Sequence, residues 1–487
     1  MSDAHPNGPT DAGDAGADAQ HATTKVILIS IVAAIGGFLF GFDTSVINGA
    51  VKAITDQFGL GSALSGFAVS CALLGAAVGA WFAGRIADRF GRKSVMVLGG
   101  VLFAVSAVGS AFAFAVWDLI LWRVVGGVGV GVASVIAPTY IAEVAPAYIR
   151  GRLGSLQQLA ITVGIFAALL SDAFIANTAG GAAEITWLGW EAWRWMFVVG
   201  VVPSLVWAFL ALQVPESPRY LIAQGETQKA SDVLRQILGA VSPASIQRKV
   251  TEIRTSMKRE TEPSLRDLRG PRFGLLPIVW VGILLSVFQQ AVGINVIFYY
   301  STTLWQAVGF DESQSLTTSV ITSVTNVVVT FVAIATVDRI GRKPLLTIGS
   351  MGMVVSLAFM AISFSQSVGS GTDVSLPQPW GTIGIIAANL YVISFGATWG
   401  PVVWVLLGEM FPGKIRAAGL AVAAAAQWLA NFAISTSFPA LADLGLQFAY
   451  GLYCIIAVLS LIFVRKAVQE TKGRELEDMG EPAGAKA

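Results

Sequence analysis

The stretch FGFDTSVING, residues 40–49, places a carboxyl group inside an otherwise apolar segment. The seventeen residues from Val26 to Phe42 contain Ser30 as their only polar side chain, and Asp43 follows directly. A carboxylate at the centre of a membrane-spanning helix costs about 2.5–3.5 kcal/mol, so an acid at such a place is expected to have a function. We predict that Asp43 binds and releases a proton. The alternative is that Asp43 only caps the outer end of its helix or reaches from there to water.

A basic partner for Asp43 stands in another apolar stretch, at Arg123 in LWRVVGGVG. A carboxyl group beside a guanidinium in a dry site can change its protonation state when its access to water changes. The histidines, His5 and His21, both precede the first apolar stretch, so no imidazole can relay protons in the membrane. The other acids relevant here are expected near the ends of apolar stretches: Asp88, Glu143, Asp338 and Glu409 on one side, and Asp118, Asp172 and Asp311 on the other. Asp43 is therefore the one acid predicted inside the membrane.

A set of uncharged amides in the apolar stretches suits the binding of a sugar. They are Gln158, Gln289, Gln290, Asn295, Asn326, Gln427 and Asn431. Amides both donate and accept hydrogen bonds, which suits a solute rich in hydroxyl groups, such as a sugar. Gln290 and Asn295 can share a face only if the helix is broken near Gly293, as happens where a span lines a substrate cavity. For each amide alone, the alternative is a hydrogen bond between helices, worth about 0.6 kcal/mol.

These residues must be positioned by a polytopic membrane protein. The chain has 487 residues, 55% hydrophobic and 13% charged, whereas a soluble domain carries about 25% charged residues. Runs of about 20 apolar residues predict twelve spans. They are 26–50, 63–83, 94–115, 119–142, 153–174, 194–213, 273–300, 316–337, 344–366, 381–408, 416–438 and 446–466. Lys and Arg cluster in the even-numbered loops and in the stretch 216–270, so both termini and that stretch are expected to be cytoplasmic.

The two halves of the chain repeat each other in the same orientation. DRFGRK at 88–93 recurs as DRIGRK at 338–343, and the spacing of Glu143, Pro146 and Arg150 recurs at Glu409, Pro412 and Arg416. We predict that this cluster forms a cytoplasmic gate whose ion pairs lock the halves; the alternative is that the charges serve topology alone. Its members are Asp88, Arg89, Arg92, Glu143 and Arg150 in the first half, and Asp338, Arg339, Arg342, Glu409 and Arg416 in the second.

The predicted fold is all-α and integral to the membrane, with twelve transmembrane helices in two six-helix bundles and short intracellular helices between them. The expected segments are a disordered N-terminal tail (1–24), an N-terminal bundle (25–213), a cytoplasmic helical linker (214–271), a C-terminal bundle (272–466) and a cytoplasmic C-terminal tail (467–487). The tail has no Lys or Arg before its end, so it does not predict a cleaved signal peptide.

Several function classes are disfavoured. A net charge of +1 argues against a nucleic-acid partner. The run GGVGVG at 126–131 lies inside a span with no strand before it, so it predicts helix contact rather than nucleotide binding. No phosphate-binding loop, catalytic triad or metal-ligand cluster is recognisable, which disfavours an enzyme or an ATP-driven pump and predicts no cofactor beyond the coupling proton.

Ten motifs follow one another along the chain: GFLFGFDTSVING, GRIADRFGRK, RVVGGVGVGVASVIAPTYIAEVAP, RGRLGSLQQLAITVG, PESPRYL, FQQAVGINVIFYYS, DRIGRKP, GPVVWVLLGEMFP, AQWLANF and ETKG. They resemble the sugar porters of the major facilitator superfamily from about residue 25 to 475. Within that family the chain is most similar to actinobacterial glucose permeases, then to bacterial proton-coupled xylose and galactose carriers.

The resemblance implies which residues contact the sugar. The matching positions are Gln158, Gln289, Gln290, Asn295, Trp404 and Gln427, with Phe40, Tyr299, Asn326, Gly400, Trp428 and Asn431 as further candidates. Ile165 stands where the xylose carriers have a glutamine and the glucose carriers an apolar residue, which favours glucose.

The resemblance thus implies a proton-coupled symporter that imports a monosaccharide, D-glucose first and xylose or galactose as alternatives, by alternating access. We expect a monomer, embedded in the lipid bilayer of a bacterial cytoplasmic membrane. A passive facilitator would leave Asp43 and Arg123 unexplained. A non-transporting sugar sensor would be expected to carry a longer tail than the 22 residues after Arg465.

Overall fold

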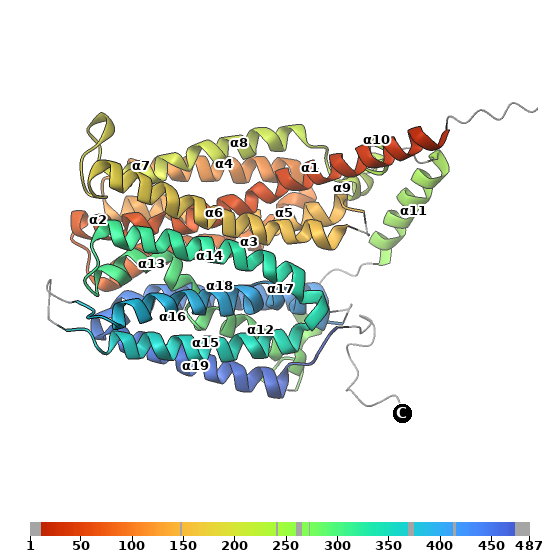
Figure 1. The fold of residues 1–487 in the computed structure, drawn as a ribbon. Helices are drawn as coiled ribbons and strands as arrows, with labels where there is room; N and C mark the ends of the chain where they lie inside the picture. Colours follow the sequence, from red (N-terminus) through yellow and green to blue (C-terminus); the bar gives the residue numbers. More distant parts are fainter. Residues whose placement is uncertain are drawn as a thin grey trace, which may run out of the picture.

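The computed structural model describes residues 11–146, 149–239, 242–259, 265–271, 273–368, 375–412 and 415–472, with the side chains of 11–23, 150–152, 256, 258–259, 337–338 and 416–417 outside the description. The described chain is almost entirely helical and contains twelve helices long and apolar enough to cross a membrane, which confirms the predicted number of spans. Figure 1 shows the first six packed as one bundle and the last six as a second bundle beside it.

The N-terminal half contains α1 (Asp11–Ser45), α2 (Ile47–Phe58), α3 (Ser62–Phe90), α4 (Arg92–Ala111), α5 (Val116–Val144), α6 (Arg150–Ala179), α7 (Ala192–Val199) and α8 (Val201–Gln213). The first span consists of α1 and α2, and the sixth of α7 and α8. A 3-10 turn, η1 (Trp187–Gly189), lies in the loop before α7.

The C-terminal half contains α12 (Pro277–Ala291), α13 (Ile294–Gln306), α14 (Glu312–Ile340), α15 (Arg342–Phe364), α16 (Trp380–Ser394), η4 (Phe395–Trp399), α17 (Gly400–Met410), α18 (Arg416–Leu444) and α19 (Leu446–Ala467). Between the halves lie the short helices α9 (Pro218–Ala223), α10 (Thr227–Leu238) and α11 (Pro243–Arg259) and the turn η2 (Leu265–Leu268). We call the ends of the spans next to Arg92 and Arg342 the inner ends, and the opposite ends the outer ends.

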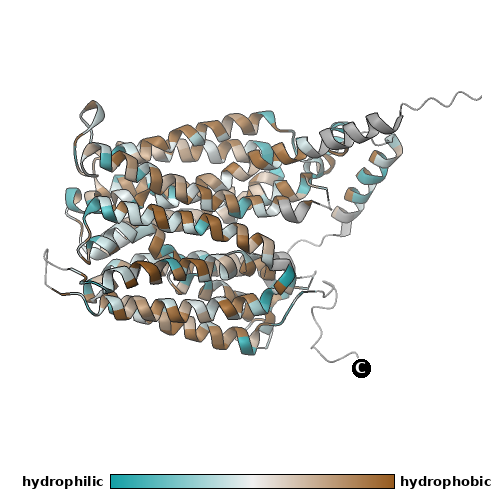
Figure 2. Ribbon diagram, in the orientation of Figure 1, coloured by the Kyte–Doolittle hydropathy of each residue, from teal (hydrophilic) through white to brown (hydrophobic). Residues whose placement is uncertain are grey.

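Apolar side chains run along the spans, and polar ones gather at the ends and in α10 and α11, as Figure 2 shows. This distribution is that of a protein solvated by lipid around its girth and by water at both ends. Many large apolar residues are exposed on the outside of the bundles, among them Phe209, Phe331 and Ile386.

The start of α1 differs from the sequence-based expectation. The helix begins at Asp11, so residues 11–24 continue the first span as helix, whereas their composition predicts disorder. Five of these fourteen residues are alanine, the strongest helix former, and they precede a long helix that they can extend. The remaining domain boundaries stay a prediction.

Glycines bring α3 and α5 into close contact, as predicted for the run at 126–131. A methyl group added at Gly127 would collide with the carbonyl oxygen of Ala72, and one at Gly131 with that of Ala76. In lipid, where no hydrophobic force pulls helices together, such close backbone approach is a main source of helix association. The N-terminal bundle therefore depends on small residues at this contact.

We expect Gly127→Ala to destabilise the protein, since overpacking of this kind costs about 1–3 kcal/mol. The measurement is the temperature at which half of the detergent-solubilised protein is lost from the monodisperse peak in size-exclusion chromatography. Gly84→Ala on the same helix pair is the matched control, because a methyl group there meets nothing within 4 Å. Equal midpoints for the two variants would contradict the packing argument.

Candidate functional site

A buried ion pair joins Asp43 on α1 to Arg123 on α5. Arg123 Nη1 lies 3.3 Å from Asp43 Oδ2 and donates a second hydrogen bond, of 2.8 Å, to the backbone oxygen of Asp43. Arg123 is 1% exposed and Asp43 9% exposed. The structure thus contains the contact between these two residues that the sequence predicts. A pair so buried is costly to desolvate, and removing one partner would leave the other charge uncompensated.

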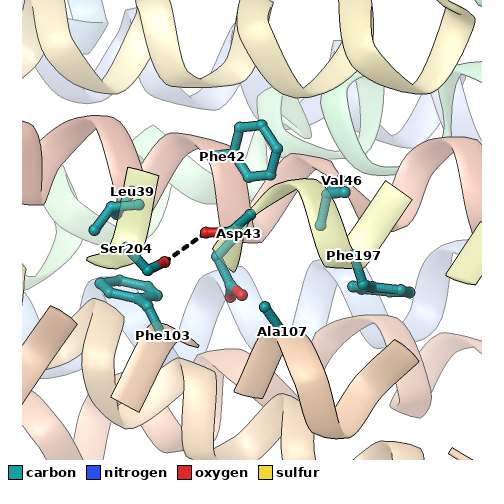
Figure 3. A pocket seen from close by; sticks show the side chains of 9 residues that line it. Leu39, Phe42, Asp43, Val46, Phe103, Ala107, Phe197 and Ser204 are labelled. Carbon is teal, nitrogen blue, oxygen red and sulfur yellow. Dashed lines mark hydrogen bonds between the residues drawn. The ribbon is translucent and has the colours of Figure 1, made fainter. Parts of the chain in front are cut away.

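A small apolar pocket lies beside the Asp43 carboxyl group, as Figure 3 shows. Its lining comes from α1, α4, α7 and α8 and from the junctions that follow α1 and α7. The lining residues are Leu39, Phe42, Val46, Phe103, Ala107, Phe197, Gly200 and Ser204. The ring of Phe197 also covers the Arg123 guanidinium, whose carbon lies 5.9 Å from the ring centroid. The carboxyl group therefore has apolar side chains on one side and the Arg123 guanidinium on the other. Protonation of Asp43 would remove its charge and weaken its attraction to Arg123 on α5.

The seventh span is broken where the amide spacing predicts. The helix α12 ends at Ala291, Gly293 has a φ of +86°, which favours glycine, and α13 begins at Ile294. The break brings the Asn295 side chain back to Gln290, and Asn295 Nδ2 donates to Gln290 Oε1 at 2.6 Å. Gln289 Nε2 donates to the carbonyl oxygens of Trp399 and Gly400, both at 3.1 Å, beside the π turn η4 in the tenth span. Two irregular helices thus hold four of the predicted sugar contacts together.

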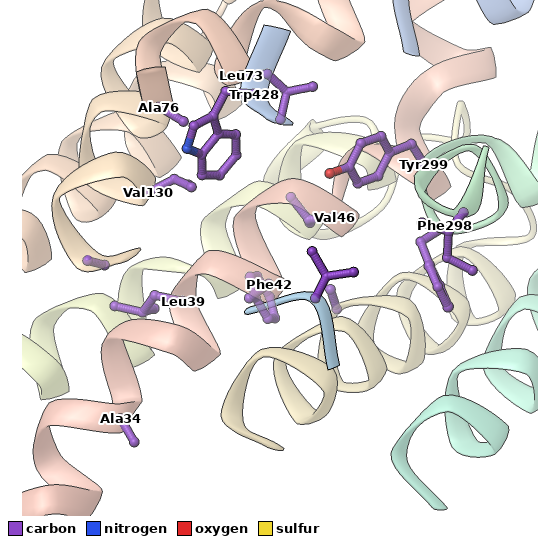
Figure 4. Close-up of a cluster of buried hydrophobic side chains, with 14 of the residues drawn as sticks. Ala34, Leu39, Phe42, Val46, Leu73, Ala76, Val130, Phe298, Tyr299 and Trp428 are labelled. Atoms are coloured by element: carbon purple, nitrogen blue, oxygen red, sulfur yellow. The ribbon is translucent and has the colours of Figure 1, made fainter. Parts of the chain in front are cut away.

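The helix α18 supplies the next group of predicted contacts. Gln427 Oε1 is buried without a hydrogen-bond partner in the described structure, so it is a free acceptor for a ligand. Trp428 packs against Phe40 with ring centroids 5.7 Å apart. Figure 4 shows its indole facing Leu73 and Val130 of the N-terminal half. The predicted contacts on α18 therefore lie where the two halves meet.

Tyr299 connects this group to the proton site. Its hydroxyl lies close to the side chains of Asn431 on α18 and Thr44 on α1. Thr44 directly follows Asp43, and its hydroxyl also donates to the carbonyl oxygen of Phe40 at 2.8 Å. A short chain of contacts thus runs from Asp43 to the amides of the C-terminal half.

The other predicted sugar contacts lie in different surroundings. Gln158 and Ile165 are half-buried on α6 of the N-terminal half, and Asn326 is buried on α14 near Gly396. Trp404 on α17 is 40% exposed. The neighbouring Gln157 has both side-chain polar atoms buried without a partner among the described residues. The sequence analysis does not include Gln157 among the candidate sugar contacts, although its amide has unused hydrogen-bonding capacity.

The predicted gate residues at the inner ends form ion pairs inside each half. Arg92 makes a bidentate pair with Glu143, with both contacts at 3.0 Å, and a further pair with Asp88 at 3.1 Å. Arg342 binds Glu409 in the same way, at 3.0 and 2.7 Å. We expected these carboxylates to lock the halves together. In this conformation the guanidinium of each arginine binds both oxygens of a glutamate on a neighbouring helix of the same bundle, so these pairs do not link the two halves.

The remaining gate residues are less informative. Arg89 stacks on the ring of Phe90 at 5.2 Å, and Arg339 is exposed, with its carbonyl oxygen accepting from Lys472. The side chains of Arg150, Asp338 and Arg416 lie outside the description. A role for these residues in locking the two halves stays a prediction.

Two glutamates that the sequence analysis missed support the repeated motif. Glu216 accepts hydrogen bonds from the backbone N–H groups of Arg92 and Lys93, and Glu470 accepts from those of Arg342 and Lys343. Each carboxylate thus caps the first turn of the third span of its half. Burial raises the pKa of Glu216, whereas for Glu470 the backbone donors outweigh burial and lower its pKa. The internal repeat could have revealed this pair, since each follows the last span of its half.

Asn48 was also missed, and it joins the halves at their outer ends. Its Nδ2 donates to the Phe298 carbonyl oxygen at 2.8 Å and to Ser301 Oγ at 2.6 Å, and Thr302 donates to its Oδ1 from the backbone and from the hydroxyl. Further contacts between the halves at this end are Ser62 with Asp443, Ser70 with Thr436, and Ala182 with Glu312. The outer side is therefore closed.

Comparison with known proteins places the chain. The profile of the family described as sugar (and other) transporter matches residues 29–482. A glucose transport protein of Synechocystis is 55% identical over 93% of this chain and 97% of its own length. A D-xylose-proton symporter of Escherichia coli strain K12 is 36% identical over 94% of this chain and 96% of its own length.

Solved structures agree with the family profile. The inward open conformation of the xylose transporter XylE from E. coli is similar with a TM-score of 0.80 and 35% identity, covering 93% of this chain and 99% of that one. The relatives are transporters and not enzymes, and the predicted arrangement of two six-helix bundles is confirmed. Closed outer ends agree with the inward-open form of this relative.

We expect Asn48→Ala to open the outer side more often, because it removes four side-chain hydrogen bonds worth about 1 kcal/mol each. The reporter is Ser70→Cys, which lies against Thr436 of the other half, in a chain whose own cysteines, Cys71 and Cys454, are replaced by alanine. The measurement is the rate of labelling from outside by a membrane-impermeant thiol reagent, expected to rise about tenfold or more. Asn177→Ala, at an exposed position near the outer end of α6, is the control and should leave the rate unchanged. We call the hydrogen bonds of the Asn48 side chain to α13 the latch at Asn48. An unchanged labelling rate in Asn48→Ala would contradict the proposal that these bonds hold the outer side closed.

Proposed function

Because this chain belongs to the sugar transporter family, we propose that it imports D-glucose together with a proton by alternating access. It is a multi-pass protein of the bacterial inner membrane. We place both termini in the cytoplasm, because the inner ends carry the Lys and Arg clusters. The transporter is proposed to act as a monomer.

The observation that carries proton coupling is the pair of Asp43 and Arg123. The guanidinium cannot lose its charge, and its burial leaves Asp43 as its close counter-charge. We propose that ionised Asp43 holds α1 against α5, and that protonation of Asp43 weakens that hold. Arg123 would then keep only the 2.8 Å bond to the Asp43 backbone oxygen. A passive facilitator would have no use for this costly pair.

Coupling to the sugar would pass through Thr44 and Tyr299. Thr44 moves with Asp43, and the Tyr299 hydroxyl contacts both Thr44 and Asn431. A shift of α1 on protonation would therefore change the hydrogen bonds open to a sugar at Asn431 and its neighbours. In turn, a bound sugar would favour one position of α1, since coupling between two ligands is reciprocal.

The amides near the break of the seventh span are proposed to bind the sugar hydroxyl groups. Gln427 Oε1 is an unused acceptor, and Gln289, Gln290 and Asn295 are held by one another and by carbonyl groups at the two irregular helices. Such preorganised amides can exchange these internal bonds for bonds to hydroxyl groups at little cost. Trp404 and Trp428 would offer flat apolar surface to the C–H face of the ring.

We expect Asp43→Asn to abolish uphill accumulation of glucose in vesicles while keeping counterflow exchange. One proton moved through about 100 mV supplies about 2.3 kcal/mol, enough for roughly fiftyfold accumulation in the parent. Asp118→Asn is the matched control: it changes an acid near the outer end of α5 that binds the Phe114 N–H, and it should accumulate sugar as the parent does. Sustained accumulation driven by a pH gradient in Asp43→Asn would overturn the proposal.

The choice of glucose rests on Ile165 and on the glucose transport protein that is 55% identical. Ile165 lies seven residues after Gln158 on α6, and so on the same helix face. We expect Ile165→Gln to improve competition by xylose relative to glucose by about tenfold, because the amide introduced at this half-buried position can pair with a sugar hydroxyl group. The measurement is inhibition of labelled glucose uptake, with Ile165→Leu as the control for shape. Better competition by xylose than by glucose in the parent would contradict the assignment.

A further inference from the structure

Asp172 is a second carboxyl group buried in the N-terminal half. The sequence predicts it near the outer end of the fifth span, but α6 continues to Ala179 and Asp172 is 0% exposed. Its Oδ2 accepts a hydrogen bond from the Gly49 N–H at 3.3 Å, and its Oδ1 is buried without a partner among the described residues. The mechanism proposed above does not use this group.

The charged and titratable groups on the helices packed against α6 are engaged elsewhere. On α1 and α2, Lys25 binds Gln236, Asp43 binds Arg123, and Lys52 pairs with Asp56. On α5, Asp118 accepts from Phe114, Glu143 pairs with Arg92, and Tyr140 donates to Pro215. On α7, Arg194 pairs with Glu191; on α14, Glu312 accepts from Ala182, and Arg339 is exposed at the inner end. The side chains of Arg150, Arg152 and Asp338 lie outside the description. Among the described side chains, no cation lies at hydrogen-bond distance from Asp172, and a buried carboxylate without a charge partner is costly.

The docking of α2 is what buries Asp172. A methyl group added at Gly49 would lie 2.7 Å from Asp172 Cβ and 2.9 Å from its Oδ2, so only glycine lets α2 approach so closely. The preceding residue is Asn48, which joins α2 to α13 of the other half. Adjacent residues of one helix therefore close the outer side and cover Asp172. Opening that side must break the Asn48 contacts with α13. A tilt of α2 in that step would also lift Gly49 from the carboxyl group of Asp172.

We propose that Asp172 is a second proton-binding site, which takes a proton from the outer water when the outer side closes and returns it there when the outer side opens. The step is the simple equilibrium between a carboxylate plus a proton and a carboxylic acid, with outer water as the source and the acceptor of the proton. The ionised form favours the open side, because water can then solvate it, and the neutral form favours the closed side. The inference rests on the proposed transport cycle, but it concerns the gate and not the driving force.

The test uses the Ser70→Cys reporter in the chain without its own cysteines, reconstituted in vesicles. Labelling of the reporter from outside is divided at each pH by labelling of an exposed reference thiol, Asn177→Cys in the same cysteine-free chain, because the reactive thiolate fraction itself rises with pH. In the parent reporter this ratio should rise about tenfold as the external pH is raised from about 5 to about 8, since deprotonation of Asp172 favours opening. Asp172→Asn, which is always neutral, should give a low and flat profile. Asp118→Asn is the control carboxyl variant and should keep the rise.

A second variant guards against an effect of misfolding. Gly49→Ala leaves Asp172 in place but prevents close docking of α2, so labelling should already be high at about pH 5. A profile in Asp172→Asn that rises as steeply as in the parent would overturn the proposal, as would low labelling in Gly49→Ala. Failure of the proposed symport would appear separately, as absence of proton-driven glucose accumulation in the parent, whatever the labelling profile shows.

Discussion

The buried guanidinium of Arg123 is the constraint on which the N-terminal half depends. It cannot be discharged, so the bundle must keep a carboxylate within reach, and Asp43 is held 3.3 Å away for this purpose. Space for that carboxylate comes from Gly126, where a methyl group would lie 3.1 Å from Asp43 Oδ1 and would collide with Ser106. The close approach of α1 to α5 and the apolar pocket at Asp43 accommodate this one ion pair in a dry bundle.

The two halves divide the chemistry although they share one plan. Both cap their third span with a glutamate, Glu216 or Glu470, and both pair an arginine with a glutamate at the inner end. The N-terminal half holds the buried ion pair, whereas the C-terminal half holds broken helices and amides. A carboxylate can bind a proton, and amides can hydrogen-bond to hydroxyl groups. The two halves therefore share a fold but carry different chemical groups.

The sequence predicts much of this arrangement because the membrane imposes simple rules. Hydropathy predicts all twelve spans, and the spacing of Gln290, Gly293 and Asn295 predicts the broken helix. Hydropathy reports where a residue lies along a span, but not what covers it. Asp172 was therefore placed at a span end, although α2 packs over it, and Asn48 was read as ordinary span although it bonds to residues some 250 positions away. The sequence predicts ion pairs between the halves at the inner ends, whereas Arg92 pairs with Glu143 and Arg342 with Glu409 inside each half. The sequence does not show which of the two arginines faces a given glutamate.

The seven residues from Asp43 to Gly49 gather most of the contacts that distinguish conformations. Asp43 binds α5, Thr44 meets Tyr299 of α13, Asn48 bonds to α13, and Gly49 rests on α6. The backbone stays helical through Val46, which joins α1 to α2, so a movement at Asp43 can be passed along the segment to Asn48 and Gly49. A net hydrogen bond is worth about 1 kcal/mol, and a proton crossing 100 mV supplies about 2.3 kcal/mol. The four side-chain hydrogen bonds of the latch at Asn48 together are thus worth more than one proton supplies, so opening the outer side needs free energy from a second source, such as the binding of sugar.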